Sequence, residues 1–143
     1  MIYKKLPAIF FVVIPYLITY GGHTVFRHYF SYVSFSSNKV PLGAAISSYA
    51  GTTIAILIAA LTFLIGIRNN NMSKLKKYGY MPSIVTMYAF SFVELGMLFL
   101  LGLLLLSNIN GFPLATITIF IAVSSFIHIC ILLTQLYLLS NKK

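Results

Sequence analysis

The sequence contains a single acidic side chain, Glu94, which lies inside one of its most apolar stretches. Glu94 follows Pro82 by twelve residues, which at ~1.5 Å per helical residue places it about 18 Å along a helix. That depth is close to the middle of a hydrocarbon core of ~30 Å. A carboxyl group there is costly and normally faces other helices or a water-filled cavity, so it marks a candidate functional position.

A histidine in the next apolar stretch, His128, is the expected partner of Glu94. The short uncharged segment around residues 108–111 predicts a turn between two antiparallel helices. Counted outward from this turn, Glu94 and His128 lie within about 1.5 Å of the same depth. Each helix also carries further polar residues on the same face: Ser91 near Glu94, and Ser124, Ser125 and Gln135 around His128. We therefore predict that Glu94 and His128 form an intramembrane polar pair.

Three roles are open for this pair. It can be a polar contact that holds helices or an oligomer together. It can be a proton or cation relay, which ionisable residues inside membranes commonly mark. It can also be a sensor whose charge state selects between two helix packings.

The sequence does not favour an enzyme. It has no second carboxyl side chain for acid–base chemistry, and Ser125 and His128 lack a third group that would complete a triad. His23 and His28 are five residues apart with no third ligand nearby, whereas zinc sites use three or four ligands. We expect no catalytic residue, no cofactor and no metal.

The elements that must position Glu94 and His128 are transmembrane helices. Of the 143 residues, 59% are hydrophobic and only 8% charged, against about 25% charged residues in soluble domains. This composition excludes a soluble globular domain and leaves room for about four spans of ~20 residues. We predict an all-α membrane protein, a single domain over residues 1–143 that forms a bundle of four transmembrane helices, at about residues 6–24, 43–67, 82–106 and 112–139.

The first span has two unusual features. Pro15 in its middle removes a backbone donor, so a neighbouring helix or water must cover the freed carbonyl. The segment 23–42 that follows alternates aromatic and hydroxyl residues, which suit the headgroup zone. It is a helix on the membrane surface, a hairpin, or a continuation of the first span.

The charge distribution predicts the orientation. Ten Lys and Arg against one acid give a net charge of +9, and eight of these cations lie at the termini or in one connection: Lys4, Lys5, Arg68, Lys74, Lys76, Lys77, Lys142 and Lys143. Positive charge is enriched on the cytoplasmic side, so both termini and the 68–80 loop are predicted to be cytoplasmic in a multi-pass protein of the bacterial inner membrane.

The same loop is a candidate contact surface. Its four cations can bind anionic lipid headgroups or a soluble cytoplasmic protein partner; they are Arg68, Lys74, Lys76 and Lys77. No recognition motif or stacking platform accompanies them, so direct binding of nucleic acid is not expected.

Small residues recur every four positions in the second span and form a ridge on one helix face: Gly43, Ser47, Gly51, Ala55 and Ala59. Small residues allow helix backbones to approach closely in lipid. The ridge therefore predicts either contact with another span of the same chain or contact with a second copy in a homo-oligomer.

Two resemblances follow from these features. In its four helices, small size and one embedded Glu, the chain resembles small multidrug-resistance exporters, although their Glu lies in the first helix beside a recurring Trp, and this chain has no Trp. The alternative that this implies is a small proton-coupled transporter or channel that uses Glu94 and His128.

In size, topology and a composition rich in Asn, Lys, Ile, Ser and Tyr, the chain also resembles the four-helix membrane subunit of Kiwa-type bacterial antiphage systems. This resemblance implies a non-catalytic inner-membrane homo-oligomer that binds a cytoplasmic DNA-binding partner and responds to phage attack at the envelope. Toxin-immunity proteins and pore-forming effectors share the architecture and stay as alternatives.

Overall fold

The computed structural model describes residues 6–66, 81–108 and 113–141. These residues form four long helices and one short 3-10 helix: α1 (Leu6–Tyr29), η2 (Ser36–Asn38), α2 (Lys39–Gly66), α4 (Met81–Leu105) and α5 (Leu114–Asn141). Prolines stand where helices begin, because a proline in the first turn loses no helical hydrogen bond. Pro41 and Pro82 lie in the first turns of α2 and α4, and Pro113 precedes α5. The predicted all-α fold with four long helices is confirmed.

The first two helices are longer than the sequence predicted. α1 runs through Pro15, Gly21 and Gly22 and ends at Tyr29, so the first part of segment 23–42 continues the first helix. α2 begins at Lys39, directly after η2. In an apolar environment a helix keeps its backbone groups paired, which outweighs the weak helix propensity of the two glycines.

Three of the helices are long and apolar enough to cross a membrane: the stretches Lys39–Thr62, Ile84–Leu105 and Leu114–Gln135. The second half of α1 carries polar residues, among them His23 and Arg27. A fourth crossing by α1 stays a prediction.

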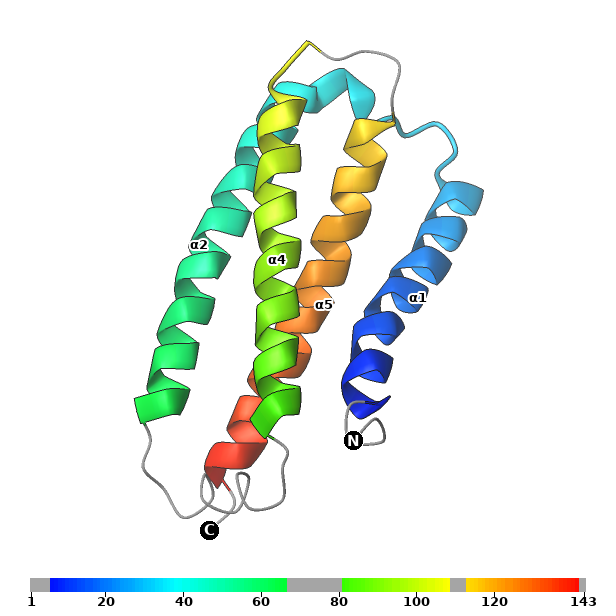
Figure 1. Cartoon of the computed structure of the whole chain (residues 1–143). Coiled ribbons are helices and arrows are strands. Elements are labelled where there is room, and N and C mark those ends of the chain that lie inside the picture. The colour runs from blue at the N-terminus through cyan, green and yellow to red at the C-terminus, as the bar shows by residue number, and fades with distance from the viewer. Residues whose placement is uncertain (1–5, 67–80, 109–112, 142–143) are drawn as a thin grey trace.

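Consecutive helices run in opposite directions (Figure 1). α1 begins, α2 ends, α4 begins and α5 ends at the same end of the bundle (Figure 1). The eight cations on which the orientation prediction rests all lie outside the described residues, but the helix ends next to them share one side. That this side faces the cytoplasm stays a prediction.

α4 is the central helix, since it packs against α1, α2 and α5. Its side chains Leu95, Leu98 and Leu105 are almost fully buried, and Leu57 of α2 and Leu132 of α5 belong to the same core. α1 packs against α5 and α4, and it lies at the opposite side of the bundle from α2 (Figure 1).

The ridge of small residues on α2 divides into two parts. A Cβ atom on Gly43 would lie 2.6 Å from the carbonyl oxygen of Gly102, and one on Gly102 would collide with the Ser47 side chain. The first part of the ridge therefore packs against α4 of the same chain. Gly51 has no neighbouring heavy atom within 4 Å of such a Cβ, and Ala55 and Ala59 are exposed.

Candidate intramembrane polar site

Polar side chains from all four long helices are buried in the interior of the bundle. Glu94 is 5% and His128 is 4% exposed. The other buried polar residues among those described are Thr19, Thr53, Ser91, Thr118, Ser124 and Ser125. Buried polar groups in native proteins almost always have hydrogen-bond partners, so the partners of these groups define what holds the site together.

The structure brings Glu94 and His128 together. The Nδ1 atom of His128 lies 2.8 Å from the Oε2 atom of Glu94. Neither atom has another polar partner within the described part of the chain. The contact joins the middle of α4 to the middle of α5, at the matched depths that the hairpin geometry predicted.

The helix α1 supplies two further contacts to the pair. The hydroxyl of Tyr16 donates a hydrogen bond of 2.6 Å to Oε1 of Glu94. The Nε2 atom of His128 lies 3.0 Å from the backbone carbonyl oxygen of Val12. Because Pro15 has no N–H, the preceding turn of α1 lacks one helical donor. The carbonyl that would have accepted this donor is that of Phe11. His128, from the neighbouring helix α5, contacts the next carbonyl along the chain, that of Val12.

The contact of His128 with the Val12 carbonyl limits where hydrogens can lie on the imidazole. A carbonyl oxygen only accepts, so Nε2 of His128 carries a hydrogen. The Nδ1 atom then either carries a second hydrogen and faces a carboxylate, or accepts one from a protonated carboxyl group. Either arrangement would make the 2.8 Å contact between Nδ1 and Oε2 attractive. The hydroxyl of Tyr16 stabilises either form, because Oε1 remains an acceptor.

Aromatic rings surround the imidazole. The rings of Tyr16 and Phe90 stand edge-on to His128, with centroid distances of 5.5 and 5.7 Å. Phe120 stacks on Tyr16 at 6.3 Å. These rings limit the access of water and strengthen the electrostatic interaction within the pair, because the local dielectric constant is low.

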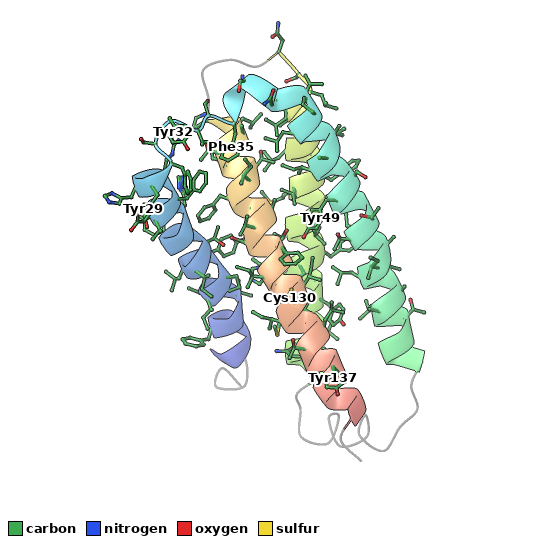
Figure 2. The ribbon with its side chains drawn as sticks, turned by 180° about the vertical axis from the view of Figure 1, so that it is seen from behind. Tyr29, Tyr32, Phe35, Tyr49, Cys130 and Tyr137 are labelled. Atoms are coloured by element: carbon green, nitrogen blue, oxygen red, sulfur yellow. The ribbon has the colours of Figure 1, made fainter. Side chains whose placement is uncertain are left out.

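The polar contacts continue one helical turn further along the bundle. Ser124 of α5 donates to Thr19 of α1 at 3.0 Å, and Thr19 donates to the carbonyl oxygen of Pro15 at 2.8 Å. The hydroxyls of Tyr49 and Ser125 lie 3.4 Å apart, with Tyr49 on the side of α2 that faces α5 (Figure 2). On α4, Ser91 is buried one turn before Glu94. The interior is thus polar over several turns.

Tyr16 belongs to the site although the sequence did not predict it. Tyrosine is amphipathic and usually lies near a membrane interface, whereas Tyr16 lies in the middle of the first apolar stretch. A tyrosine at that depth needs a hydrogen-bond partner for its hydroxyl. The position of Tyr16 in mid-span, next to Pro15, was therefore the feature of the sequence that could have indicated its place in the site.

The other predicted site residues lie elsewhere. The cations Arg68, Lys74, Lys76 and Lys77 lie outside the described residues. On the α2 ridge, Gly43 and Ser47 lie against Gly102 of α4. Across residues 6–66, 81–108 and 113–141, no three side chains of His, Cys, Asp or Glu come together as metal ligands.

A bundle of long apolar helices with a polar network at mid-depth defines a multi-pass membrane protein with a polar interior. The family that matches residues 6–143 is described as RexB, a membrane-anchored ion channel and Abi (abortive infection) component. Protein rexB of Escherichia phage lambda is 57% identical over 140 residues, which are 98% of this chain and 97% of that protein. The chain therefore belongs to the RexB family. No solved structure matches it.

This family confirms the predicted class, a small multi-pass membrane protein of an antiphage system, and a membrane location consistent with the inner membrane. It does not support the specific resemblance to the Kiwa-type subunit, because the matching family is RexB. The two share a small all-helical architecture, which is all that composition and topology can detect when no specific motif is present.

Proposed function

We propose that this chain is a non-catalytic ion channel of an abortive-infection response, with the Glu94–His128 pair as the protonation-dependent part of its conducting interior. The family description supports the conduction of ions. The observation that carries the role of the pair is its position: an acid and a base 2.8 Å apart in the middle of α4 and α5, with two further contacts from α1.

In this proposal Glu94 and His128 share one proton, and a change in that number controls conduction. When the pair gains a second proton, an uncharged carboxyl group faces a positively charged imidazolium, and the attraction between carboxylate and imidazolium is lost. When it loses its proton, two lone pairs face each other. Either change weakens the contacts between α4, α5 and α1, and it leaves a charge that requires water in the bundle. Conduction is therefore expected to depend on pH.

The test is ion flux from proteoliposomes over a range of pH, with the wild type and Glu94→Gln. A glutamine side chain keeps an acceptor for Tyr16 and a donor for His128 but cannot gain or lose a proton. We expect the pH dependence of its flux to differ from that of the wild type, because His128 is then the one member of the pair that can still bind a proton. The control is Thr118→Val, since the buried Thr118 hydroxyl bonds only the Leu114 carbonyl of its own helix. Equal pH profiles for Glu94→Gln and the wild type would refute the role of the pair.

A homo-oligomer is part of the proposal. Gly51, Ala55 and Ala59 leave a smooth, accessible strip on α2, which a second copy can approach closely. Ala55→Leu should lower the oligomer mass in mild detergent, and Ala89→Leu on an exposed face of α4 is the matched control. An unchanged mass for both variants would argue against this interface.

A cytoplasmic protein partner completes the proposal. The four cations of the 68–80 loop are expected to bind it. The test is the native mass of the complex extracted gently from its host, with the wild type and a variant in which the four cations are replaced by Gln. Recovery of a soluble protein with the wild type alone would support the partner, and recovery with neither would contradict it.

A further inference from the structure

A groove lies between α1 and α5, toward the end of the bundle where α1 ends. Its cavity volume is about 380 Å³, within the range of ~300–1,000 Å³ for ligand sites. The walls are almost entirely apolar and include Ile18 and Phe26 of α1 with Ile119 and Val123 of α5. Phe35, from the connection between α1 and α2 (Figure 2), also lines it and stacks on Phe26 at 6.0 Å.

Two basic side chains of α1 line one part of this otherwise apolar groove. Arg27 and His23 line it and are four residues apart on one face of α1. Both also line a second cavity of about 360 Å³ that shares Thr116 and Phe120 with the first. The sequence offers no carboxyl side chain to pair with Arg27, because its single acid, Glu94, is buried with His128 and Tyr16.

The length of the groove matches one leaflet of a bilayer. From Arg27 to Ile18, α1 covers nine residues, or ~14 Å, and from Thr116 to Ile127, α5 covers ~16 Å. Half of a ~30 Å hydrocarbon core is about the same. The exposed tyrosines Tyr29 and Tyr32 lie just beyond Arg27 (Figure 2), as is typical of the headgroup zone.

We infer that this groove binds one acyl chain of an anionic phospholipid, with the lipid phosphate held by Arg27 and His23. An apolar slot as long as a single leaflet, with a guanidinium at headgroup level, matches such a molecule in both shape and charge. A zwitterionic lipid would supply the same chain with less charge complementarity. A helix from a second copy would supply no carboxylate, because the one acid of each chain is buried with His128.

Gly22 allows the groove to be filled by mutation. It lines the groove, and a Cβ atom on it would meet no heavy atom within 4 Å. The adjacent Gly21 is equally open but does not line the groove. The substitutions Gly22→Phe and Gly21→Phe therefore form a matched pair, in which only the first places a ring where the acyl chain would lie.

The experiment is native mass spectrometry of the full chain, titrated with phosphatidylglycerol or with phosphatidylcholine of the same acyl chains. We expect one tightly bound phosphatidylglycerol per chain. Arg27→Gln should weaken its binding about fivefold, as expected for one cation at a lipid headgroup, whereas Lys39→Gln, the same charge change at the same end of the bundle, should not. Gly22→Phe should abolish this binding and Gly21→Phe should preserve it.

Three results would overturn the inference. Equal affinity for the two lipids, unchanged by Arg27→Gln, would show that the headgroup is not recognised. Unchanged binding by Gly22→Phe would show that the acyl chain does not lie in the groove. A lower oligomer mass for Gly22→Phe, without a bound lipid in the wild type, would assign the groove to a second copy of the chain. Arg27 is exposed, so its variant tests the headgroup contact without disturbing the fold.

Discussion

The free energy of unfolding of the bundle should depend on the contacts that Glu94 makes with Tyr16 and His128. Glu94→Leu introduces an apolar side chain of similar volume and leaves the hydroxyl of Tyr16 and the Nδ1 atom of His128 without the partners seen at 2.6 and 2.8 Å. Hydrogen bonds of this kind between membrane helices contribute ~0.6 kcal/mol on average and up to ~1.7 kcal/mol. Because the substitution removes both of these interactions, we expect the free energy of unfolding to decrease by about 1–3 kcal/mol.

The variant to compare with Glu94→Leu is Glu94→Gln, because it keeps the two contacts that Glu94→Leu removes. The glutamine oxygen accepts from Tyr16, and its amide donates to Nδ1 of a neutral His128, so both interactions remain. We expect a decrease below about 1 kcal/mol. The measurement is unfolding in mixed detergent micelles at increasing dodecyl sulfate, followed by far-ultraviolet circular dichroism. If Glu94→Leu were as stable as Glu94→Gln, the contacts of Glu94 with Tyr16 and His128 would not stabilise the bundle.

A double-mutant cycle then isolates the Glu94–His128 interaction itself. His128→Leu should also destabilise, because it removes the interactions with Glu94 and with the Val12 carbonyl. In the Glu94→Leu background the same change should cost less, by about 0.5–2 kcal/mol, because residues in direct contact are not additive. Strict additivity of the two substitutions would refute a direct interaction between Glu94 and His128.

Further predictions address packing, α1 and orientation. Gly43→Ala should destabilise the bundle by about 1–3 kcal/mol in the same unfolding assay, because the new Cβ would lie 2.6 Å from a backbone oxygen of α4, whereas Gly51→Ala has open space and should not. Tyr16→Phe should cost about 1 kcal/mol because it removes one hydrogen bond, and no change in unfolding would argue against that bond. In a cysteine-free background, Ser37→Cys should react with a membrane-impermeant maleimide added to intact cells and Lys74→Cys should not; the reverse labelling would contradict the predicted orientation.

The sequence by itself determined the class of this protein and the depth of its polar residues. A chain with four long apolar stretches does not form a soluble domain. In lipid, helices are the structure in which the backbone N–H and C=O groups of these stretches find hydrogen-bond partners. Because rise per residue is constant, the distance from the turn was enough to match Glu94 with His128 in depth. Composition also suggested an antiphage membrane protein, but it could not select the RexB family, since architecture without a specific motif is shared by unrelated systems.

Only the tertiary structure decided how the helices are rotated and which neighbours they have. Depth along a helix follows from counting residues, but rotation depends on how all four helices pack together. That packing placed Tyr16 and the Val12 carbonyl of α1 on the Glu94–His128 pair, which no spacing in the sequence indicates. The packing also gave the two parts of the α2 ridge different surroundings: Gly43 lies against α4, whereas the ridge from Gly51 to Ala55 is open. The contact between two helices depends on their shapes and on the space that other helices leave.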